Sequence, residues 1–164
     1  MARSLLLILL FAFTLPANAQ QGIPDKASAW TTDLEHILTV EQTNYLDSVL
    51  SYFEKESGVQ IGILTLDSTM STPEIFDSLV LAIANRWGVG DPVKQNGVFI
   101  GLSASLRKIR ICNGQGITGI ITDEETADIL QKQMIPAFKM GEYFQGLLLG
   151  IHYIKIELGF ADDK

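Results

Sequence analysis

The hydrophobic positions of the chain repeat with two periods, which predict helices in some segments and strands in others. Between residues 41 and 57, apolar side chains from Tyr45 to Phe53 recur every three or four positions, as on one face of an amphipathic helix. Thr39 and Gln42 have the spacing of a capping box at its start. Gly58 is the residue type expected just after its end.

Three short apolar runs have the composition of strands. The run 59–66 is rich in β-branched residues and partly alternates, and the runs 97–102 and 107–112 follow later in the chain. Only the four residues 103–106 separate the last two runs, so we expect these to form a hairpin.

Three further segments have the helical period. The segment 72–87 carries Pro73 in its first turn, where the missing N–H costs little. A second segment opens with a capping box at residue 122 and runs to about residue 134, and we expect Pro136 to end it. The last helix is predicted over 142–158.

This order of elements predicts an α/β fold. A helix that joins the strands 59–66 and 97–102 makes them a parallel, right-handed β-α-β unit, and the hairpin adds an antiparallel strand. About four helices on a small mixed sheet give a three-layer α/β/α sandwich. Trp87 and Phe138 should be at least partly buried in it.

The N-terminus has the pattern of a secretory signal peptide. Arg3 precedes an apolar run over residues 5–15 and an Ala-Asn-Ala triplet that ends at Ala19, so we expect cleavage before Gln20. The run of 11 residues is too short to span a bilayer, which argues against a stable membrane anchor after cleavage. The alternative, an N-terminal helix of the folded domain, lacks an amphipathic pattern. We therefore expect a secreted or periplasmic protein.

Three parts of the chain follow from this interpretation. They are a signal peptide over residues 1–19, a short polar leader over 20–28, and one folded domain over 29–160. After cleavage the chain has 11 Lys and Arg against 19 Asp and Glu, a net charge of −8. An acidic chain repels nucleic-acid phosphates and anionic lipid, whereas it is compatible with cation binding. Cys112 is the single cysteine, so no internal disulfide can form.

A glycine pattern and two histidines are weak signs of chemistry. Gly114, Gly116 and Gly119 have the spacing of a dinucleotide-binding fingerprint, but no β-α-β unit begins there, and a tight, close-packed turn explains them better. His36 and His152 are the only histidines, and no serine lies in a nucleophile elbow. The sequence therefore argues against a Ser-His-Asp or Cys-His enzyme.

Four aspartates at chain reversals are the candidate metal ligands. Asp33 and Asp67 should lie at the carboxyl ends of the strands, where ligands of open α/β sheets usually bind, and Asp91 and Asp123 should lie at the opposite edge. Carboxylates with hydroxyl and carbonyl oxygens suit Ca²⁺ or Mg²⁺. Equally, these acids could only cap turns or stabilise a helix start. Arg107, after the hairpin loop, is a candidate to pair with phosphate oxygens.

Several segments, in order along the chain, resemble the signature of the TPM domain family. They are 32–39 (TDLEHILT), 86–90 (RWGVG), 96–100 (NGVFI), 107–111 (RKIRI), 114–123 (GQGITGIITD) and 135–143 (IPAFKMGEY). The resemblance implies a secreted, periplasmic or lumenal α/β/α module. Divalent-cation binding and acid-phosphatase activity are attributed to some members. The family's glutamate in its G-x-G-x-E-G motif would fall at Thr118, so one acidic group is missing here.

Two functions follow as hypotheses. The first is a module that binds a divalent cation and assists the assembly or maintenance of an envelope protein, without turnover. The second is a metal-assisted phosphatase, in which the ion polarises a small phosphoester and Arg107 binds its oxygens. The absence of a compact Asp-x-Asp nucleophile motif favours the first.

Export gives a direct prediction. Mass spectrometry of the protein recovered outside the cytoplasm should show a chain that begins at Gln20. Recovery of the protein from a membrane fraction with Met1 intact would show that the N-terminal run is not a cleaved signal.

Overall fold

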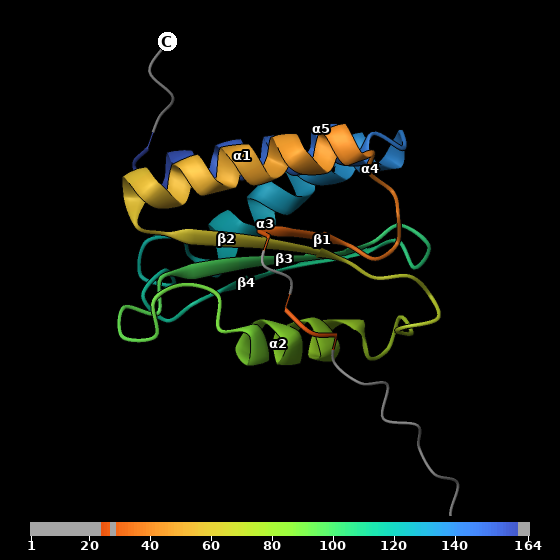
Figure 1. The fold of residues 1–164 in the computed structure, drawn as a ribbon, viewed down its shortest axis with the longest axis horizontal. Helices are drawn as coiled ribbons and strands as arrows, with labels where there is room; N and C mark the ends of the chain where they lie inside the picture. Colours follow the sequence, from red (N-terminus) through yellow and green to blue (C-terminus); the bar gives the residue numbers. More distant parts are fainter. Residues whose placement is uncertain (1–23, 27–28, 161–164) are drawn as a thin grey trace, which may run out of the picture.

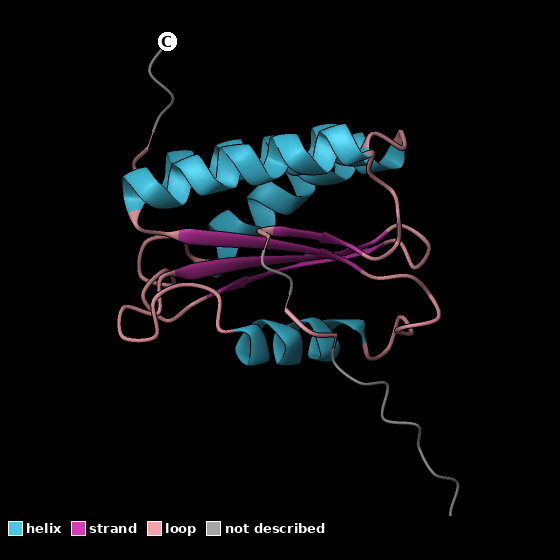
Figure 2. Cartoon of the chain, viewed as in Figure 1, coloured by secondary structure: helices cyan, strands magenta, loops and turns pink. Residues whose placement is uncertain are grey.

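The computed structural model describes residues 24–26 and 29–160, so the expected signal peptide and its cleavage site lie outside the described residues. The four strands are β1 (Thr31–Asp33), β2 (Gln60–Thr65), β3 (Gly97–Ser103) and β4 (Lys108–Asn113). The helices are α1 (Val40–Ser57), α2 (Phe76–Trp87), α3 (Asp123–Asp128), the π-helix η1 (Ile129–Met134), α4 (Ile135–Lys139) and α5 (Tyr143–Glu157). Figures 1 and 2 show their arrangement.

The strands form one mixed sheet in the order β1-β2-β3-β4. β2 pairs with β3 in parallel, with Ile63 opposite Ile100, and β3 pairs with β4 antiparallel, with Ile100 opposite Ile111. This confirms the predicted β-α-β unit and the hairpin. The sheet lies between helices on both faces, which confirms the three-layer α/β/α sandwich (Figure 1).

The edge strand β1 was not predicted from the sequence. Its three residues pair in parallel with β2, Thr31 opposite Ile63 and Asp33 opposite Thr65. Three residues are too few to show a period of two, so only the partner strand reveals this segment as a strand. The first helix is consequently the crossover of a second parallel β-α-β unit.

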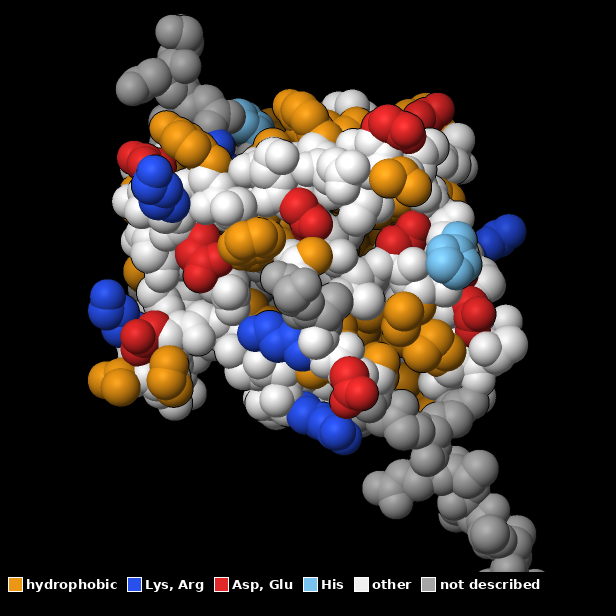
Figure 3. All heavy atoms as spheres, in the orientation of Figure 1, with side chains coloured by type: hydrophobic (Ala, Val, Ile, Leu, Met, Phe, Trp, Pro, Cys, Tyr) orange, Lys and Arg blue, Asp and Glu red, His pale blue; other side chains and the backbone are white. Residues whose placement is uncertain are grey.

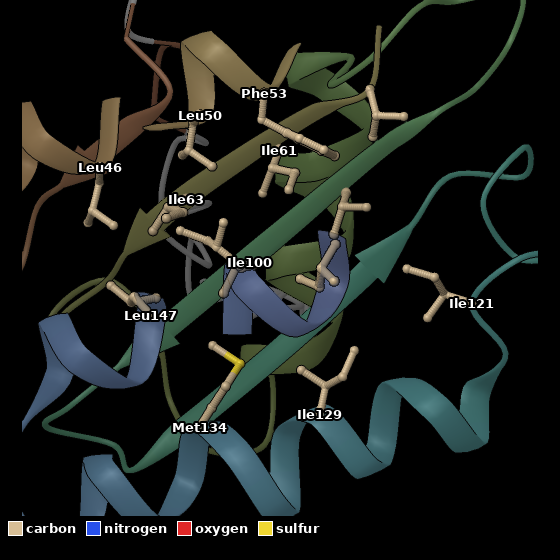
Figure 4. Close-up of a cluster of buried hydrophobic side chains, with 14 of the residues drawn as sticks. Leu46, Leu50, Phe53, Ile61, Ile63, Ile100, Ile121, Ile129, Met134 and Leu147 are labelled. Carbon is tan, nitrogen blue, oxygen red and sulfur yellow. The ribbon is translucent and has the colours of Figure 1, made fainter. Parts of the chain in front are cut away.

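Two separate cores cover the two faces of the sheet. On one face, side chains of α1, η1 and α5 meet Ile61, Ile63 and Ile100, as Figure 4 shows. On the other face, α2 packs on Leu64, Leu66 and Phe99. Successive residues of β2 therefore point into different cores, as the pleat of a strand requires.

The predicted caps are confirmed. Thr39 and Gln42 form a capping box at α1, and Gly58 ends that helix with a left-handed φ of 72°. Thr122 and Glu125 form a second capping box at α3. Each box satisfies N–H groups that the first turn of a helix leaves unpaired.

Two predicted helix boundaries are wrong. The helix predicted from residue 72 begins at Phe76, after a turn that contains Pro73. Pro136 does not end the third helix, because α3, η1 and α4 follow one another without a break from Asp123 to Lys139. The wider turns of the π-helix come directly before Pro136, where an ordinary α-helical turn would clash with the proline ring. This continuous stretch counts as one of the four helical segments that the sequence predicts.

Several expectations about single residues are also met. Trp87 is buried and Phe138 is half-buried. A Cβ atom would lie 2.2 Å from the Gln95 carbonyl oxygen at Gly114 and 2.1 Å from the Lys94 carbonyl oxygen at Gly116, which confirms a close-packed turn at these two glycines. A Cβ atom at Gly119 would meet nothing within 4 Å, so close packing does not explain that glycine. In the part of the chain that is described, no helix is both long and apolar enough to cross a membrane.

Candidate functional site

The carboxyl edge of the parallel strands is held together by the side chain of Asp33. This residue ends β1, opposite Thr65 of β2. Its carboxylate accepts hydrogen bonds from the Thr65 hydroxyl and from the backbone N–H groups of Ile37 at 3.3 Å and Leu38 at 2.9 Å. Asp33 therefore fixes the loop between β1 and α1 against the end of β2.

Glu35 extends this edge to the hairpin. Its N–H donates to the Thr65 hydroxyl oxygen at 3.0 Å, and its carboxylate accepts from the N–H groups of Ala104 and Ser105, both at 2.7 Å. The two acceptors are the separate carboxylate oxygens, so the contact is bidentate. One side chain thus joins the loop after β1 to the turn between β3 and β4, across the ends of the two central strands.

Asp67 forms a separate turn just after β2. Its Oδ1 atom accepts from the Thr69 N–H at 2.8 Å and from the Thr69 hydroxyl. These bonds lower the pKa of the Asp67 carboxyl, and the nearby positive charge of His36 lowers it further. His36 is exposed and has a left-handed φ of 56°, so it reaches this position from a tight turn in the loop that Asp33 holds.

Asp33 is the last residue of β1, and Asp67 comes two residues after the end of the parallel neighbour β2. Both aspartates therefore lie at the predicted carboxyl edge. Among the described residues no group of three or more His, Cys, Asp or Glu side chains could hold a metal ion. Both oxygens of Asp33 already accept backbone N–H bonds. The donor set fits at most a weak, water-rich cation site, in which carbonyl, hydroxyl and water oxygens make up most of the shell.

Asp91 and Asp123 belong to the opposite edge of the sheet, and each has a local role there. Oδ1 of Asp91 accepts from the N–H groups of Val93 and Lys94, both at 2.8 Å, and these bonds lower the pKa of the Asp91 carboxyl. Asp123 is an acid in the first turn of α3, where it faces the positive end of the helix. These two contacts are the turn-capping and helix-start roles that the sequence left open as alternatives.

The histidine and cysteine side chains do not form a catalytic centre. His152 is half-buried on α5, and its ring stacks edge-on against Tyr153 with centroids 5.3 Å apart. Burial raises the pKa of the Cys112 thiol, which disfavours the reactive thiolate. Cys112 therefore fits a structural role better than that of a nucleophile.

A pocket of about 600 Å³ opens between the β3–β4 hairpin and the turn that joins α4 to α5. Its apolar lining includes Leu102, Ile109, Ile135, Phe138 and Tyr143, and its basic lining consists of Arg107, Lys108 and Lys139. In Figure 1 the hairpin turn and the α4 end lie at the same end of the sheet as the β1–α1 loop. The pocket is thus part of the carboxyl edge that Asp33 and Glu35 organise.

The structure places Arg107 at the mouth of this pocket. Its backbone has a left-handed φ of 52°, and its N–H donates to the Ala104 carbonyl oxygen at 3.2 Å, which closes the hairpin turn. Its side chain is exposed and makes no ion pair among the described residues. The predicted phosphate-binding residue therefore lines a cavity, whereas none of the four predicted aspartates does.

The sequence did not reveal Glu35 or the second wall of the pocket. Glu35 lies within a segment that resembles a family motif, but no local pattern indicates that it contacts residues 69 and 70 positions later. The second wall comes from Ile135 and from residues after Pro136, where a helix end was expected.

The family of the chain follows from a comparison with known proteins. A profile of the TPM domain matches residues 31–156, which include all four strands and all but the last residue of α5. The chain belongs to the TPM domain family. A search of curated proteins gave no significant match.

Solved structures share the fold of this TPM domain. The N-terminal domain of a protein from P. gingivalis is 28% identical, with a TM-score of 0.70 and coverage of 79% of this chain and 82% of that one. The BA42 protein of Bizionia argentinensis is 23% identical, with a TM-score of 0.64 and coverage of 77% and 84%. An N-terminal domain from Corynebacterium glutamicum is 13% identical, with a TM-score of 0.60 and coverage of 86% of both chains.

The departure from the family motif lies away from the pocket. Thr118, where the resemblance implies a glutamate, is exposed in the glycine turn after β4, and its hydroxyl donates to the Gln115 carbonyl oxygen at 3.0 Å. β4 runs antiparallel to β3, so this turn belongs to the edge that also carries Asp91. The position at which the resemblance implies a glutamate therefore lies at the opposite edge, while Asp33, Glu35 and Asp67 lie at the carboxyl edge.

The role of Glu35 gives a testable prediction. Glu35→Ala should lower the free energy of unfolding by about 1–2 kcal/mol, because two backbone N–H groups lose a charged acceptor. Glu35→Gln keeps one acceptor oxygen and should lose less. Urea denaturation measures both changes.

Glu56→Ala is the matched control for this prediction. Glu56 is exposed near the end of α1, so the substitution should change stability by no more than about 0.5 kcal/mol. Equal stability of Glu35→Ala and Glu56→Ala would show that the hairpin does not depend on Glu35.

Proposed function

We propose that this TPM domain is an exported binding module, which takes up a divalent cation and assists the assembly or maintenance of envelope or membrane proteins without turning over a substrate. The expected export comes from the N-terminal pattern of Arg3, the apolar run and Ala19. The partner class follows from that location, because an exported domain meets proteins of the envelope.

The hydrogen bonds that the carboxylates accept are the observation that favours binding over catalysis. Asp33, Glu35 and Asp67 each accept hydrogen bonds from backbone N–H groups of their own or neighbouring loops. A general base or a nucleophile needs a carboxylate oxygen directed at the substrate. These acids instead position loops around an open pocket, which suits a binding surface.

The cation would be held weakly at the carboxyl edge. Both hydrogen bonds from Thr69 go to Oδ1 of Asp67, so Oδ2 is the oxygen that Ca²⁺ or Mg²⁺ would take. Few carboxylates mean low affinity, on the order of 10⁻⁴–10⁻³ M for extracellular Ca²⁺ modules. Asp91 and Asp123, at the other edge, are the reserve site.

Metal-assisted phosphatase activity is the second candidate. Arg107 and Lys139 line one cavity and are able to bind phosphate oxygens, and this observation supports it. No carboxylate lines that cavity among the described residues, so none is placed there to act as a general base or a nucleophile.

Thermal melts test the cation site. Ca²⁺ or Mg²⁺ at about ten times its dissociation constant should stabilise the protein by roughly 1–2 kcal/mol relative to EDTA, because only the folded state holds the ion. Asp67→Asn should abolish this difference, whereas Asp123→Asn should keep it. Each variant is compared with itself in EDTA, so a general loss of stability does not affect the result.

Two outcomes would contradict this assignment. Equal melting temperatures of the wild-type protein with cation and with EDTA would end the cation proposal. A stabilisation that survives in Asp33→Asn and Asp67→Asn but is lost in Asp91→Asn or Asp123→Asn would move the ion to the opposite edge.

Hydrolysis of a chromogenic phosphomonoester separates the two functions. Under the binding proposal, the rate should equal that of the buffer, with or without chelator, because no carboxylate among the described residues lines the cavity to activate a nucleophile. Turnover that is abolished by EDTA and by Arg107→Gln, yet kept in Lys94→Gln, would establish the phosphatase instead.

A further inference from the structure

The basic pocket at the carboxyl edge differs in charge from the rest of the domain. The chain after the expected cleavage has a net charge of −8, and on the face drawn in Figure 3 acidic and basic side chains are interspersed. Arg107 and Lys139 nevertheless line one cavity, and none of the described residues that line it is acidic. Lys108 is also a lining residue, but it alternates along β4 with Ile109 and its charge acts on Glu74 before α2, so its charge lies toward the other face of the sheet. A positive cavity in an acidic protein attracts an anion.

Arg107 and Lys139, the pocket cations, form no ion pair among the described residues. The ion pairs among the described residues are Arg86 with Asp25 and Lys132 with Asp128, and neither pair includes a cation of the pocket. Glu74 is close enough to Lys108 for that charge to contribute to a lowered pKa of the Glu74 carboxyl, as the smallest of several causes. Arg107 and Lys139 are exposed, so their charges face the open side of the cavity.

The inner wall of the pocket is apolar. Leu102 is 2% exposed, and the Phe138 and Tyr143 rings lie with centroids 5.7 Å apart at 30°. Met140 also lines the pocket and is 73% exposed, so a flexible apolar side chain stands at its mouth. Water makes few favourable contacts with such a wall. An apolar group that covers it removes apolar surface from water and is stabilised by this burial.

The size of the cavity limits what it can hold. Its volume of about 600 Å³ is within the range of small-molecule sites. Few basic residues line it, and they form no extended stripe, which argues against a nucleic-acid groove. A ligand that matches both walls has a compact anionic head and an apolar body.

We propose that this pocket binds a small amphipathic anion, a carboxylate or phosphate attached to an alkyl chain or ring. The anionic head lies between Arg107 and Lys139, and the apolar body lies against Phe138, Tyr143 and Met140. This inference deepens the proposed binding function by giving it a ligand class, and it needs neither the cation nor turnover. The ligand lies outside the loops that Asp33 and Asp67 hold, so the two sites can be tested apart.

Titration calorimetry of the purified protein in EDTA tests the proposal, with octanoate and octyl phosphate as anionic probes. Octanol lacks the charge, and acetate and inorganic phosphate lack the alkyl chain. Both octyl anions should bind about tenfold or more tightly than these three controls, because only they use both walls. The stronger of the two anions then tells whether carboxylate or phosphate is preferred.

Variants locate the binding. Arg107→Gln with Lys139→Gln should weaken the octyl anions by about tenfold or more, since two charged donors are lost. Met140→Gln should weaken them less. Lys94→Gln and Val93→Gln are the matched controls, because both residues are exposed in the loop at the opposite edge. Lys139→Gln alone gives a second charge variant on an exposed side chain, in case the double variant does not fold.

Three results would overturn the proposal. The first is no binding of either octyl anion. The second is an equal loss in Lys94→Gln and in the pocket variants, which would show nonspecific charge attraction. The third is inorganic phosphate bound as tightly as octyl phosphate, which would show a plain anion site. None of these results bears on the thermal shift with Ca²⁺ or Mg²⁺, so a failure here is distinct from a failure of the cation site.

Discussion

The burial of the two central strands on both faces is the constraint on which the fold depends. All seven residues of β3 and five of the six of β2 are buried. A strand with two apolar faces must be covered on both faces. Parallel strands also need crossover connections, and the helices that make these crossovers supply the cover. α1 and α5 cover one face and α2 covers the other, which divides the interior into two cores.

The same constraint places the candidate site. Three parallel strands end at one edge, and the polar groups there lie on loops, since the strands themselves are occupied by packing. Asp33 and Glu35 then give these loops one geometry through bonds to backbone N–H groups. Side chains fixed in this way can position loops, but they are poor general bases or nucleophiles, because their oxygens already accept hydrogen bonds.

Charge and shape at this edge point to binding. The pocket takes one wall from the hairpin and the other from the α4–α5 turn, two parts of the chain that meet only in the folded state. The hairpin wall brings the charge of Arg107, the helical wall brings that of Lys139, and the apolar surface comes from both. No acid of the edge lines this cavity, but the Glu35 carboxylate holds the backbone of Ala104, which does line it.

Local signals in the sequence determined the helices, the three longer strands, the capping boxes and the mixed sheet, because periodicity and capping depend on neighbours within about four residues. The TPM motifs likewise indicate the family from the sequence alone. The tertiary structure alone decided what depends on distant partners. β1 exists because β2 supplies its hydrogen bonds, and the helix passes through Pro136 because a π-helix precedes it. Glu35 reaches a turn about 70 residues away, and the pocket needs both of its walls. Pairing across such separations leaves no period in the chain, and it becomes visible only when the sheet has formed.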